Sequence, residues 1–170
     1  MKTILITGGI ASGKSAVRRY LEAKGYPVYD SDSRTKALYE NIPGLKAEVE
    51  EVTGIPFHML KVIFEYPNKL AALEALVYPL VHEDFTKWRS EQDSELVFFE
   101  SAIALDKPIF DDIYDEVWLV TAPIEQRLTR NVHTASRIAT QRLPDLSEAD
   151  KVIVNDSTLE SLYRKIDNLI

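Results

Sequence analysis

A glycine-rich octapeptide near the N-terminus constrains the fold of this chain more than any other feature. Residues 8–15 have the sequence Gly-Gly-Ile-Ala-Ser-Gly-Lys-Ser, which fits the pattern G-x-x-x-x-G-K-[ST]. An apolar run precedes it at residues 4–6, and a helical pattern follows over residues 15–21. Between a strand and a helix, such glycines let successive backbone N–H groups converge on phosphate at the helix N-terminus. The octapeptide therefore predicts a phosphate-binding P-loop rather than a turn that only joins a strand to a helix.

The P-loop also supplies most of the candidate residues for binding ATP. In such loops the lysine carries a positive charge to the β- and γ-phosphates, and the hydroxyl that follows is a ligand for Mg²⁺. We therefore expect Lys14 to be catalytic and Ser15 to bind the metal. The expected nucleotide-binding residues of this segment are Gly9, Ile10, Ala11, Ser12, Gly13, Lys14, Ser15 and Ala16.

Short β-rich runs alternate with longer helical patterns along the rest of the chain. Several of these runs are continuously apolar, which is typical of parallel strands covered by helices on both faces. The pattern predicts an α/β, three-layer P-loop NTPase fold, with a five-stranded parallel sheet flanked by helices, as a single domain over residues 1–170. The expected strands are residues 3–7, 27–30, 95–99, 116–121 and 151–154.

The segment between the second and third expected strands is too long for a simple crossover. Residues 31–94 are therefore expected to form an inserted helical region that binds the acceptor substrate. Apolar residues recur in it at helical spacing, but Pro79 interrupts them, so we expect two helices or one bent helix. Near the C-terminus, Ser157 and Glu160 have the spacing of a capping box, which predicts the start of a terminal amphipathic helix.

Composition excludes several classes of protein. Twenty Lys and Arg against 27 Asp and Glu give a net charge of −7, which disfavours binding to nucleic acid or to an anionic membrane surface. The chain has no cysteine and three scattered histidines, which excludes disulfides and makes structural zinc improbable. No apolar run approaches the ~20 residues of a membrane helix. We expect a cytoplasmic protein with a small-molecule partner, without nucleic acid or membrane, as a monomer or weak homo-oligomer.

A P-loop alone does not distinguish a switch, a transporter ATPase and a kinase. The chain has no N-K-x-D run of the kind that recognises guanine in GTPases, and no L-S-G-G-Q-like signature of transporter ATPases. A small-molecule kinase is therefore the leading class.

Several ordered segments resemble the dephospho-CoA kinase family, and the resemblance covers nearly the whole chain. Residues 7–15 are similar to the family's T-G-G-I-G-S-G-K-S and differ only at Ala11, and Tyr78 stands where the family's H-P-L-[IV] segment has histidine. Between residues 130 and 137 the expected lid is several residues shorter than the family pattern. The other matching segments are residues 28–32 (D-A-D), 99–103, 126–130 (Q-x-x-R), 137–141 (R-I-x-x-Q) and 149–155 (A-D-x-V-I-x-N).

The resemblance implies a function and adds roles for particular residues. It implies ATP-dependent phosphorylation of the ribose 3′-hydroxyl of dephospho-CoA, the last step of coenzyme A biosynthesis, with ATP and Mg²⁺ as cofactors. Spacing alone leaves open whether Asp32 takes the proton of the acceptor hydroxyl or whether it or Asp30 caps a helix that starts near Ser33. The resemblance favours Asp32 as a catalytic residue.

Four further residues are candidates at the edges of the expected site. Arg130 is expected to be catalytic and Arg137 to bind the nucleotide, because guanidinium groups suit a transferring phosphoryl group; the alternative is a solvated helix face. Glu100 ends the third expected strand and could hold Mg²⁺ or cap a helix, and Asn155 resembles the family's adenine-side loop or is a common turn residue.

Two alternative functions stay open from the sequence. One is a nucleoside or nucleotide kinase of the same layout. The other is a catalytically weak sensor that binds ATP through the P-loop, which the short lid favours.

Overall fold

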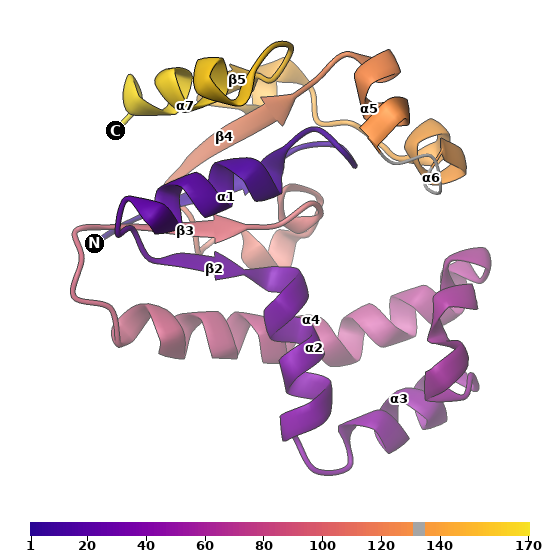
Figure 1. The fold of residues 1–170 in the computed structure, drawn as a ribbon. Helices are drawn as coiled ribbons and strands as arrows, with labels where there is room; N and C mark the ends of the chain where they lie inside the picture. The colour runs from indigo at the N-terminus through magenta and orange to yellow at the C-terminus, as the bar shows by residue number, and fades with distance from the viewer. Residues whose placement is uncertain (131–134) are drawn as a thin grey trace. The chain divides into compact units, whose positions relative to one another are not determined.

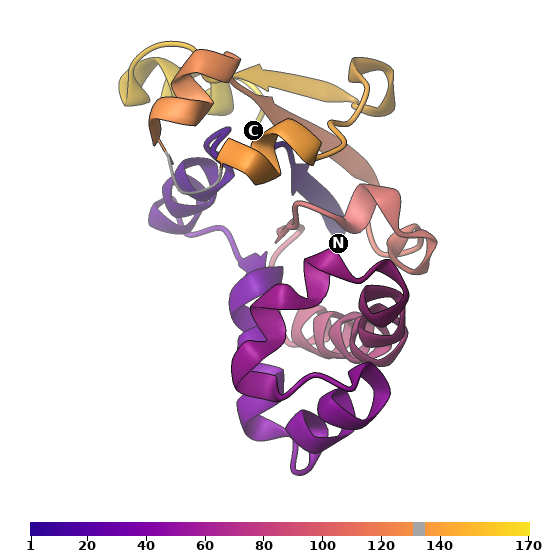
Figure 2. The ribbon, with the colours of Figure 1, turned by 90° about the vertical axis from the view of Figure 1, so that its right-hand side faces the viewer.

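The computed structural model describes residues 1–130 and 135–170 and divides them into two compact units. The sheet unit comprises Met1–Asp30 and Gln92–Ile170, and the helical unit comprises Ser31–Glu91 (Figures 1 and 2). The helical unit ends three residues before the expected limit of the insertion, residue 94.

The sheet unit contains five parallel strands in the order β2-β3-β1-β4-β5 (Figure 1). All five expected strands are confirmed, each within one residue at either end. Their continuous apolar runs explain the agreement, because a strand covered on both faces needs apolar side chains at every position. The observed strands are β1 (Lys2–Thr7), β2 (Val28–Asp30), β3 (Leu96–Glu100), β4 (Glu116–Thr121) and β5 (Lys151–Val154).

Helices α1 (Lys14–Ala23) and α7 (Leu159–Asp167) pack against one face of this sheet. Alternate strand residues, such as Ile6 and Phe98, point toward these helices and are fully buried with them. The strand residues that alternate with these point to the opposite face of the sheet. On that face Phe99 packs against Phe110 of η3 (Pro108–Phe110). The expected sheet flanked by helices is thus confirmed.

The position of β1 in the sheet determines where a ligand can bind. Its neighbours are β3 on one side and β4 on the other. The chain therefore forms β2 and β3 on one side of β1, and then β4 and β5 on the other side. Ligands of open parallel sheets bind at such a reversal point, beyond the carboxyl ends of the strands. The glycine-rich loop, residues 8–13, emerges from β1 at this point.

The helical unit contains α2 (Ser31–Asn41), α3 (Leu45–Thr53), η1 (Phe57–Glu65) and α4 (Pro67–Ser90). α2, α3 and η1 all pack on α4 (Figure 2). α4 continues through Pro79, so the expected alternative of two separate helices is wrong. Proline at this position removes one backbone hydrogen bond, but buried Val77, Val81 and Phe85 anchor the turns on either side of it.

The remaining elements connect the last strands of the sheet unit. Thr158 caps α7, since its Oγ1 accepts a hydrogen bond from Ser161 N at 3.2 Å, so the expected cap at Ser157 is wrong by one residue. Four residues of the expected lid, 131–134, lie outside the described residues. Within the described ranges, no helix is both long and apolar enough to span a bilayer. The connecting elements are η2 (Ala104–Asp106), α5 (Ile124–Arg130), α6 (Ala135–Thr140) and η5 (Leu146–Glu148).

Candidate active site

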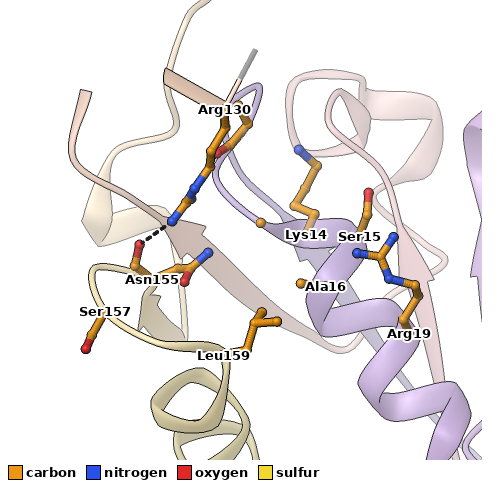
Figure 3. Close-up of a pocket in the computed structure, with 10 residues that line it drawn as sticks. Lys14, Ser15, Ala16, Arg19, Arg130, Asn155, Ser157 and Leu159 are labelled. Carbon is orange, nitrogen blue, oxygen red and sulfur yellow. Dashed lines mark hydrogen bonds between the residues drawn. The ribbon is translucent and has the colours of Figure 1, made fainter. Parts of the chain in front are cut away.

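The P-loop forms one wall of a pocket of about 600 Å³ in the sheet unit (Figure 3). The loop ends at Gly13, whose φ of 111° is in the left-handed region, and α1 begins directly after it. The N-terminus of α1 therefore opens into the pocket, where the positive end of the helix dipole favours an anion. The lining residues are Ala11, Gly13, Lys14, Ser15, Ala16, Arg19, Arg130, Asn155, Ser157 and Leu159.

Lys14 places a cation at the wall of this pocket. Its Nζ donates hydrogen bonds to the carbonyl oxygens of Gly8, at 2.9 Å, and Gly9, at 3.2 Å. The side chain thus lies along its own loop, next to the Ser15 hydroxyl (Figure 3). A phosphate bound at the helix N-terminus would meet both groups.

Asn155 and Arg130 bind the same loop from elements far away in the sequence. Asn155 is 6% exposed, and its Nδ2 donates to the Ser12 carbonyl at 2.9 Å, which a simple turn residue would not do. Arg130, at the end of α5, donates to the Ala11 carbonyl at 3.1 Å and to the Asn155 carbonyl at 3.4 Å (Figure 3). These contacts place both candidates at the pocket, and a solvated helix face does not account for them.

Replacing Gly13 with alanine is expected to destabilise the protein. A Cβ at this position would lie 2.2 Å from Asn155 Nδ2, so the bond from Asn155 to Ser12 would have to break. Gly25→Ala is a matched control, because Gly25 also has a positive φ but a Cβ there meets nothing within 4 Å. Backbone strain costs about 1–2 kcal/mol in either variant. The lost bond adds about 1 kcal/mol to the cost of Gly13→Ala.

Chemical denaturation of the two glycine variants measures this difference. Gly13→Ala should lower the free energy of unfolding more than Gly25→Ala does. Equal losses would contradict the close approach of Asn155 to the loop.

Two carboxylates at the ends of neighbouring strands share one arginine. Asp30 ends β2 and Glu100 ends β3, and the two residues pair in register. Arg18 Nε lies 2.8 Å from Glu100 Oε2, and Arg18 NH2 lies 3.6 Å from Asp30 Oδ2. Burial raises the pKa of the Glu100 carboxyl, the charge of Asp30 adds to this, and the positive charges of Lys14 and Arg18 oppose it. Sequence reasoning missed Arg18, although it lies one helical turn after Lys14.

The raised pKa of Glu100 predicts a pH dependence of stability. The folded chain holds this proton more tightly than the unfolded chain, whose ordinary pKa is 4.5. The stabilisation is therefore complete below that pH and is lost as the pH rises through the higher pKa of the folded state. We expect the free energy of unfolding of the wild type to fall relative to that of Glu100→Gln as the pH rises above 4.5 in urea titrations. A difference that is constant with pH would contradict the raised pKa.

Asp32 belongs to the helical unit and lies in the first turn of α2. Since α2 begins at Ser31, Asp32 is inside the helix, and the alternative that it caps a helix starting near Ser33 is wrong. Tyr78 donates a hydrogen bond to Glu74 Oε1 at 3.0 Å. Burial raises the pKa of Tyr78 far above its usual range, and the charges of Glu74 and Asp32 add to this. Asp32 is thus within electrostatic reach of a half-buried, protonated phenol.

Not every candidate lies at the pocket. Arg137 is exposed on α6 and is not among the residues that line the pocket. Conversely, sequence reasoning gave no role to Arg127 or Gln141, yet each hydrogen-bonds to Ile10 of the P-loop. Both lie in the segments that resembled the family's lid signatures, which was the signal that could have indicated them.

The oxygen donors present fit a magnesium ion bound together with phosphate. Ser15 Oγ lies at the pocket, and the carboxylate of Glu100 is close enough to Lys14 for their charges to interact. Among the described residues, no three Asp, Glu or His side chains gather to hold a metal on their own. Mg²⁺ typically keeps several waters and takes one or two protein oxygens plus substrate phosphates, so the small donor set suits it.

A P-loop at the reversal point of a parallel sheet, with a lysine at the pocket and carboxylates at neighbouring strand ends, defines a P-loop kinase. A family model described as dephospho-CoA kinase matches residues 58–161. A relative from Porphyromonas gingivalis named dephospho-CoA kinase is 38% identical over 76% of this chain and 68% of its own. Another with this name, from Fusobacterium nucleatum, is 30% identical over 95% of this chain and 93% of its own. The chain belongs to the dephospho-CoA kinase family.

Two solved structures are similar to this chain in fold. The crystal structure of TT1252 from Thermus thermophilus has a TM-score of 0.80 and 28% identity, and covers 99% of this chain and 95% of that one. Dephospho-CoA kinase from Campylobacter jejuni has a TM-score of 0.64 at 18% identity, over 99% of this chain and 98% of that one. The second likeness shows the fold alone.

Proposed function

We propose that this enzyme transfers the γ-phosphoryl group of ATP to the ribose 3′-hydroxyl of dephospho-CoA, giving ADP and coenzyme A. Membership of the dephospho-CoA kinase family supports dephospho-CoA as the acceptor substrate. The observation that carries the mechanism is the P-loop pocket, in which Lys14, Ser15 and Arg130 meet at the N-terminus of α1. That arrangement suits a triphosphate better than any other ligand class, because the N-terminus of α1 and three cationic side chains, Lys14, Arg19 and Arg130, line one cavity.

The residues of the pocket have separate roles in this proposal. Lys14 stabilises the charge on the β- and γ-phosphates, and Arg130 adds positive charge from α5 as the phosphoryl group moves. Arg137 completes the nucleotide contacts from α6. Asn155 holds the loop through its bond to Ser12 and borders the space for the nucleoside.

A divalent ion, Mg²⁺ in this proposal, would be held by Ser15 and Glu100. When bound, it would neutralise negative charge on the phosphates. Arg18 keeps Glu100 next to a positive charge, which favours the ionised carboxylate that a metal requires.

Asp32 is proposed as the general base, with the inserted region 31–94 binding the acceptor. The 3′-oxygen forms a bond to the γ-phosphorus as the bond to the bridging oxygen of ADP breaks, and the hydroxyl proton passes to the Asp32 carboxylate. The match of residues 28–32 to the family's D-A-D segment supports this assignment.

A nucleoside kinase and an ATP-binding sensor are not favoured as alternatives, since the relatives that match most of the chain are named dephospho-CoA kinase. We extend the proposal to a cytoplasmic location, which the consumption of ATP supports.

The test is to incubate the protein with ATP and, in parallel, dephospho-CoA, adenosine or AMP, while ADP and phosphorylated acceptor are measured together. We expect ADP and coenzyme A in equal amounts with dephospho-CoA, and little turnover with the other two acceptors. ADP without product would favour an ATPase or a sensor. Product from adenosine or AMP alone would favour a nucleoside or nucleotide kinase.

A further inference from the structure

Two side chains hydrogen-bond to the backbone of one P-loop residue, Ile10, one at its carbonyl and the other at its N–H. Arg127 of α5 donates from Nε to the Ile10 carbonyl at 2.8 Å. The Ile10 N–H in turn donates to Gln141 Oε1, also at 2.8 Å. Gln141 directly follows α6, so α5 and the residue after α6 both hold Ile10.

Ala11, the residue after Ile10, has an unfavourable backbone conformation. Ala11 has a φ of 60°, and it is the one residue other than glycine with a positive φ in the described ranges. A side chain with a Cβ disfavours this left-handed region because the Cβ crowds the following carbonyl oxygen. Such a conformation persists only where the surroundings fix it.

The surroundings of Ala11 fix both of its neighbouring peptides. In the peptide before Ala11, the Ile10 carbonyl accepts the hydrogen bond from Arg127, and the Ile10 N–H, one peptide bond earlier, is held by Gln141. In the peptide after Ala11, the Ala11 carbonyl accepts a hydrogen bond from Arg130 NH1 at 3.1 Å. Arg127 is 4% exposed and lies close to Gly9, where an added Cβ would be 2.4 Å from Arg127 NH2, so replacing it would disturb the core. Gln141 is half-buried and holds Ile10 through its amide oxygen alone, so it can be replaced with less damage to the core.

We propose that Gln141 and Arg127 are positioning residues that hold Ala11 in its left-handed conformation and so keep the P-loop in its phosphate-binding form. Neither residue needs to touch the nucleotide. The inference rests on the proposed nucleotide site. It adds that the contribution of Gln141 to nucleotide affinity depends on which residue stands at position 11. Glycine adopts a positive φ without steric cost, so a loop with glycine at this position needs these hydrogen bonds less.

A double-mutant cycle tests this dependence. The four proteins are wild type, Ala11→Gly, Gln141→Leu and the double variant, and ADP affinity is measured by isothermal titration calorimetry. Gln141→Leu is expected to raise the dissociation constant about tenfold in the wild-type background, because the binding conformation of the loop loses one stabilising hydrogen bond relative to its other conformations. In the A11G background the same change should raise it about threefold or less.

Three comparisons separate this role from a general loss of structure. Gln141→Glu keeps an acceptor oxygen of the same reach and should restore ADP affinity to within about twofold of wild type. Gln92→Leu, a control at another glutamine of the sheet unit, should leave affinity unchanged. Thermal unfolding of each protein shows whether it is folded at the temperature of the titration.

The outcomes are distinguishable. An equal loss of affinity in both backgrounds, no loss on Gln141→Leu, or no rescue by a folded Gln141→Glu would overturn the inference while leaving the nucleotide site intact. A folded wild type that does not bind ADP would overturn the proposed function and this inference with it.

Discussion

Lys14→Ala is expected to lower kcat for coenzyme A formation by about 10²–10³-fold, the usual cost of removing one preorganised group that stabilises transition-state charge. The reason is that Lys14 is the cation of the loop itself, fixed over the carbonyl oxygens of Gly8 and Gly9 at the pocket wall. Arg130 reaches the loop from another element and cannot replace that charge at the same point. Steady-state kinetics with saturating ATP and dephospho-CoA measures the effect.

The fold should survive this substitution, because the side chain of Lys14 lines the pocket and is not part of the core. Circular dichroism and thermal unfolding check this. Lys24→Ala is the matched control, since Lys24 caps the same helix and pairs with Asp167 away from the pocket. Full turnover by Lys14→Ala would show that the P-loop assignment is wrong.

Asp32→Asn should lower kcat by about 10²–10⁴-fold, the range that general-base assistance supplies. The amide has the same shape but cannot accept the proton of the 3′-hydroxyl at its oxygen as a carboxylate does. ATP affinity should stay close to the wild-type value, because the P-loop belongs to the sheet unit and Asp32 to the helical unit. Measuring kcat together with the dissociation constant of ADP separates these two effects.

Two comparison variants make the role of Asp32 specific. Glu40→Gln removes an exposed carboxylate from the same helix, α2, and should leave kcat unchanged. Asp30→Asn removes the carboxylate that ends β2 and pairs with Arg18. If Asp30→Asn lowered kcat more than Asp32→Asn did, Asp30 would be the base. Normal kinetics with reduced stability in Asp32→Asn would make Asp32 a structural residue.

Local sequence signals predicted the sheet and its loop well. The strands were evident because buried parallel strands contain continuous apolar runs, as at residues 96–99 of β3. The P-loop was evident because its glycines and lysine have fixed spacing. Both features depend on neighbours in the sequence, which a single chain displays directly.

Features that depend on tertiary packing were predicted poorly or missed. Pro79 should interrupt a helix by its local chemistry, but burial of the turns around it keeps α4 continuous. The hydrogen bond that Ile10 accepts from Arg127 and the one that it donates to Gln141 join residues 117 and 131 positions apart. Spacing along one helix cannot reveal such contacts. The positive φ of Ala11 was equally hidden, since alanine gives no signal for a left-handed conformation.

The hydrogen bond from Asn155 to the Ser12 carbonyl joins residues 143 positions apart and so ties the first loop of the chain to the end of its last strand. The pocket beside this bond is lined both by α1 and by the segment that leads into α7. A nucleotide bound there as proposed would contact both segments, so unfolding of either one would remove part of its site. Ligand occupancy and unfolding of the sheet unit are therefore thermodynamically linked. At a nucleotide concentration 100 times the dissociation constant, this linkage adds about 2.7 kcal/mol to the free energy of unfolding. In a cell rich in ATP, the working stability of this kinase is that of its nucleotide complex.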